Sequence, residues 1–173
     1  MSKPAMPQPT SSQPASGQPA SRRSVPLPDE AATAALARRL APALAAGDVL
    51  ALRGDLGAGK TAFARALVRA LVGDGEAEVP SPTFTLVQTY DTAAAPVWHF
   101  DLYRLSGPDE VPELGWDEVS DGIALVEWPD RLGPLLPRDR LELTMAFDGP
   151  EARRAELAGF GAWGPRLDTL ELP

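Results

Sequence analysis

The residues Gly54 to Thr61 read GDLGAGKT, and this stretch is the most informative part of the chain. It fits the phosphate-loop pattern, a glycine, four residues and then Gly-Lys-Thr, and it directly follows the apolar run Val49 to Leu52. The glycines of such a loop allow backbone conformations and close approaches that a Cβ would forbid, so successive N–H groups can point at phosphate oxygens. The pattern therefore predicts a buried strand that leads into a binding site for a nucleoside triphosphate.

The segment after the loop strengthens this interpretation. Thr61 to Leu71 (TAFARALVRAL) has amphipathic helical spacing, and the free amides and dipole at the start of such a helix favour an anion. Only two of the 16 basic residues are lysines, and Lys60 is the one beyond residue 25. An ammonium is a compact point charge that fits between β- and γ-phosphates, whereas a guanidinium needs a fork of acceptors. We therefore expect Lys60 on the phosphates and the Thr61 hydroxyl on Mg²⁺.

Composition predicts one folded domain in this chain of 173 residues. Residues 1–25 are mostly Pro, Ser, Gln and Ala, so we expect a disordered leader with almost nothing to bury. Residues 26–161 are enough for one domain with a core, and we assign the phosphate loop to it. Residues 162–173 are interpreted as a C-terminal tail.

Cysteine content and charge exclude several classes of protein. The chain has no cysteine, so it has neither a disulfide framework nor a thiolate metal site. No apolar run approaches the length of a membrane span, so we expect a cytoplasmic protein without membrane contact. The formal net charge of −8 argues against broad neutralisation of nucleic-acid phosphates. Any contact with RNA is therefore expected mainly through a partner.

The segments on either side of the loop predict a mixed sheet. A helix with Asp29 as its N-cap precedes the strand Val49–Arg53. Phe84–Tyr90 and Val97–Leu102 are rich in β-branched and aromatic residues, and only six residues separate them. A parallel crossover needs a dozen or more connecting residues, so this pair is predicted to be an antiparallel hairpin.

The C-terminal half continues the same pattern. Ser106–Trp116 is predicted to be a loop with a short helix, and Ile123–Glu127 a buried strand. Leu141–Phe147 and Arg154–Phe160 are predicted to form a second hairpin around a Gly-Pro break. The expected fold is α/β, a P-loop NTPase-like three-layer sandwich with a mixed sheet that includes an antiparallel hairpin.

Two carboxylates follow apolar strands, Asp101 after VWHF and Glu127 after IALV. A phosphate-loop enzyme needs a strand-end carboxylate to hold Mg²⁺ or its water shell, and a second can orient an attacking water. Each alone is equally consistent with a solvated strand-end acid, but two in one small domain favour function. His99 lies beside Asp101, and as a lone strand histidine it is interpreted as structural rather than as a general base.

Four blocks, GDLGAGKT, SPTFTLVQTY, HFDLYRL and LVEWPDR, occur here in the order found in the bacterial TsaE family, which the chain closely resembles over about Pro26 to Phe147. That family is the ATPase component of the machinery that makes threonylcarbamoyladenosine in tRNA. The resemblance implies a protein that binds ATP with Mg²⁺ and hydrolyses it, slowly when its partners are absent. It also implies that the protein acts together with TsaB and TsaD. Contact with tRNA would be mainly indirect, through that complex.

The resemblance also implies roles for individual residues. Lys60 and Asp101 are the expected catalytic residues, and Thr61 and Glu127 the expected ligands of Mg²⁺. Leu27 to Asp29 is expected near the adenine. The residues expected to contact the nucleotide are Gly57, Ala58, Gly59, Lys60, Thr61, Ala62, Thr83 and Trp128. For Trp128, a core or interface indole is at least as good an interpretation as direct nucleotide contact.

Two other functions remain open from the sequence. A small-molecule P-loop kinase would use Asp101 as the base for a substrate hydroxyl, although the predicted hairpin at Phe84–Leu102 argues against it. A non-catalytic sensor would bind ATP and its partners without any need for hydrolysis.

Overall fold

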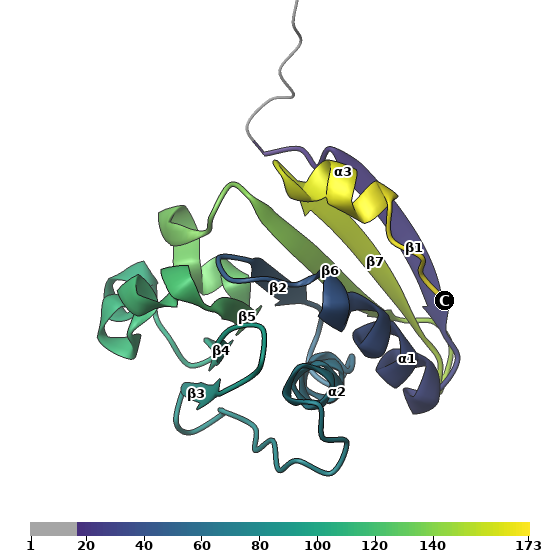
Figure 1. Cartoon of the computed structure of the whole chain (residues 1–173), viewed down its shortest axis with the longest axis horizontal. Helices are drawn as coiled ribbons and strands as arrows, with labels where there is room; N and C mark the ends of the chain where they lie inside the picture. The colour runs from purple at the N-terminus through teal and green to yellow at the C-terminus, as the bar shows by residue number, and fades with distance from the viewer. Residues whose placement is uncertain (1–16) are drawn as a thin grey trace, which may run out of the picture.

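A seven-stranded mixed sheet organises the computed structural model, which describes residues 17–173 (Figure 1). The strand order is β1-β7-β6-β2-β5-β4-β3. The strands are β1 (Ser21–Leu27), β2 (Val49–Arg53), β3 (Val87–Tyr90), β4 (Val97–Asp101), β5 (Ile123–Glu127), β6 (Arg140–Phe147) and β7 (Arg153–Phe160). The α-helices are α1 (Glu30–Leu40), α2 (Lys60–Val72) and α3 (Trp163–Asp168). The 3₁₀ segments are η1 (Ala41–Ala43), η2 (Pro108–Glu110), η3 (Pro112–Leu114), η4 (Trp116–Asp121) and η5 (Pro129–Leu135).

The centre of the sheet is parallel and its margins are antiparallel. β2 runs parallel to both β5 and β6, and β4 runs parallel to β5. β3, β7 and β1 join as antiparallel strands. The central strands are almost uniformly apolar because both of their faces are covered. Their carboxyl ends meet at one edge of the sheet, which places the segments after β2, β4 and β5 side by side.

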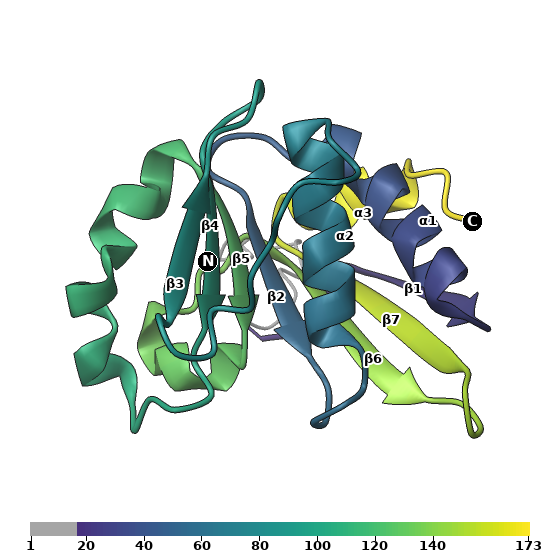
Figure 2. The ribbon, with the colours of Figure 1, turned by 90° about the horizontal axis from the view of Figure 1, so that it is seen from below.

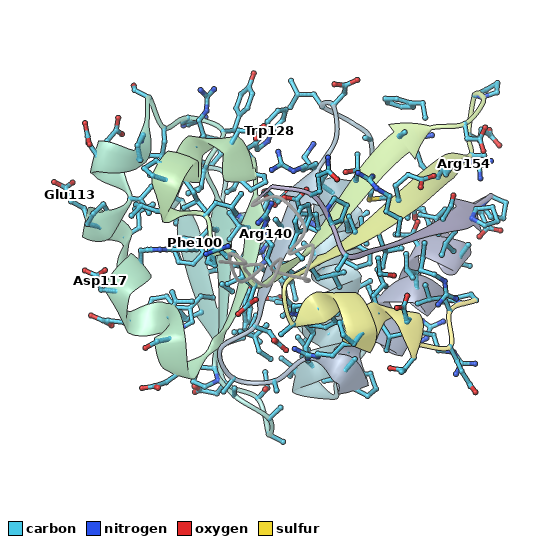
Figure 3. All side chains as sticks on the ribbon, turned by 90° about the horizontal axis from the view of Figure 1, so that it is seen from above. Phe100, Glu113, Asp117, Trp128, Arg140 and Arg154 are labelled. Carbon is cyan, nitrogen blue, oxygen red and sulfur yellow. The ribbon has the colours of Figure 1, made fainter. Side chains whose placement is uncertain are left out.

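The sheet is the middle layer of three, as the sequence predicted. Alternate residues of its strands pack with α1, α2 and α3 on one face (Figure 2). The residues that point to the other face, such as Phe100 and Val126, pack with Leu132 under the 3₁₀ segments η2 to η5. Figure 3 shows Glu113 and Asp117 projecting outward from this second layer, while Phe100 lies between it and the sheet. This second layer packs with residues of β2, β3, β4 and β5, and within residues 17–173 no residue of β1 or β7 belongs to its core cluster.

The predicted elements around the loop are confirmed. Asp29 caps α1, since its Oδ1 accepts a hydrogen bond of 2.8 Å from the Ala32 amide. Both predicted hairpins, β3–β4 and β6–β7, are antiparallel. The first strand of the β3–β4 hairpin begins at Val87 rather than Phe84, because Leu86 adopts a positive φ of 67° that ends the extended run. None of the described helices combines the length and apolarity needed to cross a membrane.

The predicted disordered leader is wrong over its last residues. Ser21 to Leu27 form β1, which pairs along its length with β7. Val25 and Leu27 are only 2% and 1% exposed, whereas Arg22, Ser24 and Pro26, which alternate with the inward-facing residues of the strand, are exposed. Two buried side chains are a weak signal in a composition dominated by Pro, Ser and Gln, so the strand was missed. The remainder of that prediction, residues 1–16, lies outside the described residues.

The predicted C-terminal tail is also part of the fold. Helix α3 buries Trp163 and Leu167 in the core shared with α1 and α2. Arg166 stacks on Trp163 at 3.6 Å and donates to Asp48 Oδ1 at 2.6 Å. These contacts tie the C-terminal segment to the turn before β2, and they depend on pairs far apart in sequence.

The buried position of Val25 predicts its effect on stability. Val25→Ala should lower the free energy of unfolding by about 2 kcal/mol, because it removes buried methyl groups and leaves a small cavity. Arg22→Ala, on the exposed face of the same strand, should change it by less than about 0.5 kcal/mol. Urea denaturation of both variants measures the difference. Equal effects would show that β1 is not part of the core.

Candidate functional site

The loop between β2 and α2 runs close against β6. Gly54 has a φ of +136°, and a Cβ built there would collide with the carbonyl oxygen of Met145 on β6. Gly57 has a φ of +78°, yet the nearest atom to a Cβ there is Phe147 Cζ at 4.0 Å. Gly54 is therefore required by both conformation and space, whereas Gly57 is required by conformation alone.

Helix α2 starts at this loop with free backbone donors. The first amides of a helix have no intrahelical acceptor, and within residues 17–173 those of Lys60, Thr61 and Ala62 donate to no other backbone acceptor. No side chain caps this end of the helix. Free donors and the positive end of the helix dipole make this position suited to an anion.

Lys60 is the cation of the site, and it is 5% exposed. Its Nζ donates to the carbonyl oxygens of Gly54 at 2.5 Å and Asp55 at 2.9 Å. The same Nζ lies 4.3 Å from the centre of the Trp128 ring. Burial lowers the pKa of Lys60 below its ordinary value, while the charges of Glu127, Asp101 and Asp55 oppose that shift. The ammonium is thus folded back against the loop and held among acceptors.

The two predicted carboxylates lie together at the end of the parallel strands. Asp101 and Glu127 are opposite each other in the β4–β5 register, and they are 8% and 2% exposed. Thr61 Oγ1 donates to Glu127 Oε1 at 2.9 Å, which links α2 to β5. Burial raises the pKa of Asp101, although the hydrogen bond from the Tyr103 amide, 3.1 Å from Oδ1, acts against it.

Trp128 lies directly after β5, on the connection where Figure 3 labels it. It has a left-handed backbone with φ 59° and ψ 54°, a conformation that costs energy for a residue other than glycine. Its ring lies 5.0 Å from that of Tyr103 and beneath the Lys60 ammonium. The indole therefore lines the cavity and also packs against the apolar residues under η2 to η5.

A cavity of about 560 Å³ joins these groups. Thr83, whose Oγ1 lies 2.6 Å from Ser81 Oγ, contributes to its wall from the loop before β3. Leu27 and Asp29 also line it. The predicted residues that line the cavity are Gly57, Gly59, Lys60, Thr61, Ala62, Thr83, Asp101, Glu127 and Trp128. Ala58 is not among them, since its side chain is buried in the core and its amide donates to Asp55.

Arg104 and Arg153 also line the cavity, and the sequence did not single them out. Arg104 lies within the block HFDLYRL, so its position beside Asp101 was available as a signal. Arg153 comes from β7, and its Nη2 lies 3.4 Å from the carbonyl oxygen of Gly57. Only the pairing of β7 with β6 brings it to the loop, so no local pattern could have found it.

The fold defines an α/β protein with a seven-stranded mixed sheet between two covering layers. The chain belongs to the TsaE family, because the model of the family described as "Threonylcarbamoyl adenosine biosynthesis protein TsaE" matches residues 27–155. The resemblance drawn from the four sequence blocks is thereby confirmed. Members of this family are threonylcarbamoyladenosine biosynthesis proteins.

Individual relatives agree with this assignment. The "tRNA threonylcarbamoyladenosine biosynthesis protein TsaE" of Rickettsia felis is 41% identical over 146 residues, which cover 84% of this chain and 85% of that protein. The protein of the same description from Bacillus subtilis is 38% identical over 141 residues, 80% of this chain and 84% of its own length. The solved "Crystal structure of Bacillus subtilus YdiB" superposes with a TM-score of 0.66 at 30% identity, covering 81% of this chain and 86% of that one.

The contrast between two loop glycines gives a test of the site's geometry. Gly57→Ala should cost about 1 kcal/mol of folding free energy, the strain of a left-handed alanine. Gly54→Ala should cost about 1 to 3 kcal/mol more, because its Cβ also collides with the backbone of β6. Chemical denaturation of both variants measures the difference, and equal losses would contradict the close approach of the loop to Met145.

Proposed function

We propose that this protein is the Mg²⁺-dependent ATP-binding and hydrolysing component of the machinery that makes threonylcarbamoyladenosine in tRNA, acting with TsaB- and TsaD-like partners. The observation that carries the proposal is the convergence of Lys60, Thr61, Asp101 and Glu127 on the free amides at the start of α2. Family membership supports the pathway, and the site chemistry supports the nucleotide.

The residues present fit a nucleoside triphosphate. Gly54, Gly57 and Gly59 all have positive φ values, so the loop has a backbone conformation that other residues disfavour and that can turn N–H groups toward an anion. Within residues 17–173, the free amides of α2 and the Lys60 ammonium are donors without a carboxylate bound to them, which is what phosphate oxygens require. The cavity of about 560 Å³ is within the usual size range of small-molecule sites.

Thr61 and Glu127 fit a magnesium ion bound with the nucleotide. Mg²⁺ prefers oxygen ligands, and it is usually held by one or two carboxylates together with phosphates and water. The Thr61 hydroxyl and the Glu127 carboxylate are such oxygens, and they already lie 2.9 Å apart. When bound, the ion would neutralise charge on the phosphates that these residues hold in place.

The residues divide the work of hydrolysis. Lys60 would exchange its loop carbonyls for phosphate oxygens and stabilise the charge that develops on them. Asp101 would accept a hydrogen bond from a water and orient it for attack, because its carboxylate is buried at the cavity wall and held through Oδ1 by the Tyr103 amide. Positioning and charge stabilisation are the whole of this chemistry, since no covalent intermediate with the protein is required.

Substitutions at Lys60 test the proposal directly. Lys60→Ala should weaken MgATP binding by about tenfold or more, because charge-assisted hydrogen bonds are lost. Lys60→Arg should also show a clear loss despite its retained charge, since a planar fork does not fit the position of the ammonium. Isothermal calorimetry measures affinity, and phosphate release in the presence of the partners measures turnover.

Arg39→Ala, an exposed change on α1, is the matched control and should bind as the wild type does. The ATP proposal is wrong if the wild-type protein binds no MgATP under conditions that saturate a known ATPase. It is also wrong if Lys60→Ala retains wild-type affinity.

A further inference from the structure

His99 forms a buried pair with Glu127. The histidine lies on β4, two residues before Asp101, and its Nε2 is 2.8 Å from Glu127 Oε2. The two side chains are 1% and 2% exposed. A carboxylate buried to this extent needs hydrogen-bond donors, and His99 supplies one of the two that Glu127 has within the described residues.

The surroundings of the imidazole assign its proton. His99 Nδ1 is buried and has no hydrogen-bond partner among the described residues. A buried N–H without an acceptor costs more than a buried lone pair without a donor, because carbonyl and imine acceptors are left unpaired more readily than N–H groups. The ring therefore carries its proton on Nε2, and that N–H donates to Glu127 Oε2.

These contacts divide the two oxygens of Glu127 between two elements. Oε2 accepts from His99 on the neighbouring strand, and Oε1 accepts from Thr61 at the start of α2. The terminal torsion of a glutamate side chain has only a broad preference, so hydrogen bonds to both oxygens are what fix the plane of its carboxylate. His99 is fixed by the parallel β4–β5 ladder, so it sets the plane of the carboxylate and directs Oε1 at α2.

We propose that His99 is a positioning residue that holds the Glu127 carboxylate in the orientation needed to bind the cation of a cation–nucleotide complex. The inference rests on the proposed function. His99 is not placed to act as a base on a group in the cavity, because it is absent from the cavity wall and Nδ1, the nitrogen that would take up a proton, is buried. The sequence predicted a structural role for His99, and this proposal specifies that role as orienting the Glu127 carboxylate.

Two amide substitutions separate the hydrogen bond from the packing. His99→Gln places an amide N–H near the position of Nε2, whereas the side chain of His99→Asn is one carbon shorter and places it near Nδ1. Both variants replace a ring by a neutral amide, so they differ mainly in reach. Calorimetry of ATP binding with Mg²⁺ and then with EDTA gives the part of the affinity that depends on the ion.

His99→Asn should lose about tenfold or more of the Mg²⁺-dependent gain in affinity, the usual effect of removing a partner of a metal ligand. Its affinity for ATP in EDTA should change by less than about threefold, because Lys60 and the α2 amides are unaltered. His99→Gln should recover most of the gain. Equal behaviour of the two variants, or equal losses with and without Mg²⁺, would overturn the proposal and leave only a packing role.

Nuclear magnetic resonance of the unaltered protein provides a test that does not depend on the folding of a variant. His99 is the only histidine in the chain, so ¹⁵N-histidine labelling reports on this ring alone. We expect the Nε2–H form, unchanged when MgATP is added. An Nδ1–H form would overturn the inference. If instead the wild type binds no MgATP while its ring shows the expected form, the proposed function fails and the His99–Glu127 bond stands.

Discussion

The parallel pairing of β2 with β5, and of β5 with β4, is the constraint on which the site depends. Because parallel strands end at the same edge, this pairing brings the loop after β2 beside the strand-end residues Asp101 and Glu127. The Thr61–Glu127 hydrogen bond then joins the start of α2 to the sheet. A one-residue change in register between β4 and β5 would move one of the two carboxylates to the opposite face of the sheet and separate the pair.

The negative charge of the chain makes the few hydrogen-bond donors and the one cation at the start of α2 important for binding an anion. The chain has a formal net charge of −8, and the cavity already contains two buried carboxylates. A polyanion binds beside these carboxylates only where nearby donors and cations outweigh their electrostatic repulsion. In the proposed site, the α2 amides and Lys60 supply that attraction. The proposed magnesium ion would turn Glu127 from a repulsive neighbour of phosphate into a ligand that helps to hold it.

The sequence predicted the parts of the structure that local pattern encodes. The Gly54–Thr61 loop, the capped helix after Asp29 and both hairpins follow from turn residues, caps and short spacings. It failed where distant pairs decide the outcome. Val25 is buried because β1 joins the sheet beside β7 and packs in the core under the helices, and Arg153 lines the cavity because β7 pairs with β6. Trp163 likewise packs in the core with residues of α1 and α2, and these contacts cannot be predicted from the C-terminal segment alone.

The level of threonylcarbamoyladenosine in tRNA, measured by mass spectrometry of tRNA nucleosides, shows whether the proposed nucleotide site serves the making of this nucleoside. Cells depleted of the protein would be complemented with wild type or Lys60→Ala at equal protein levels. If the proposed site serves this modification, the modified nucleoside falls on depletion and only the wild type restores it. An unchanged level on depletion, or full restoration by Lys60→Ala, would contradict the proposal.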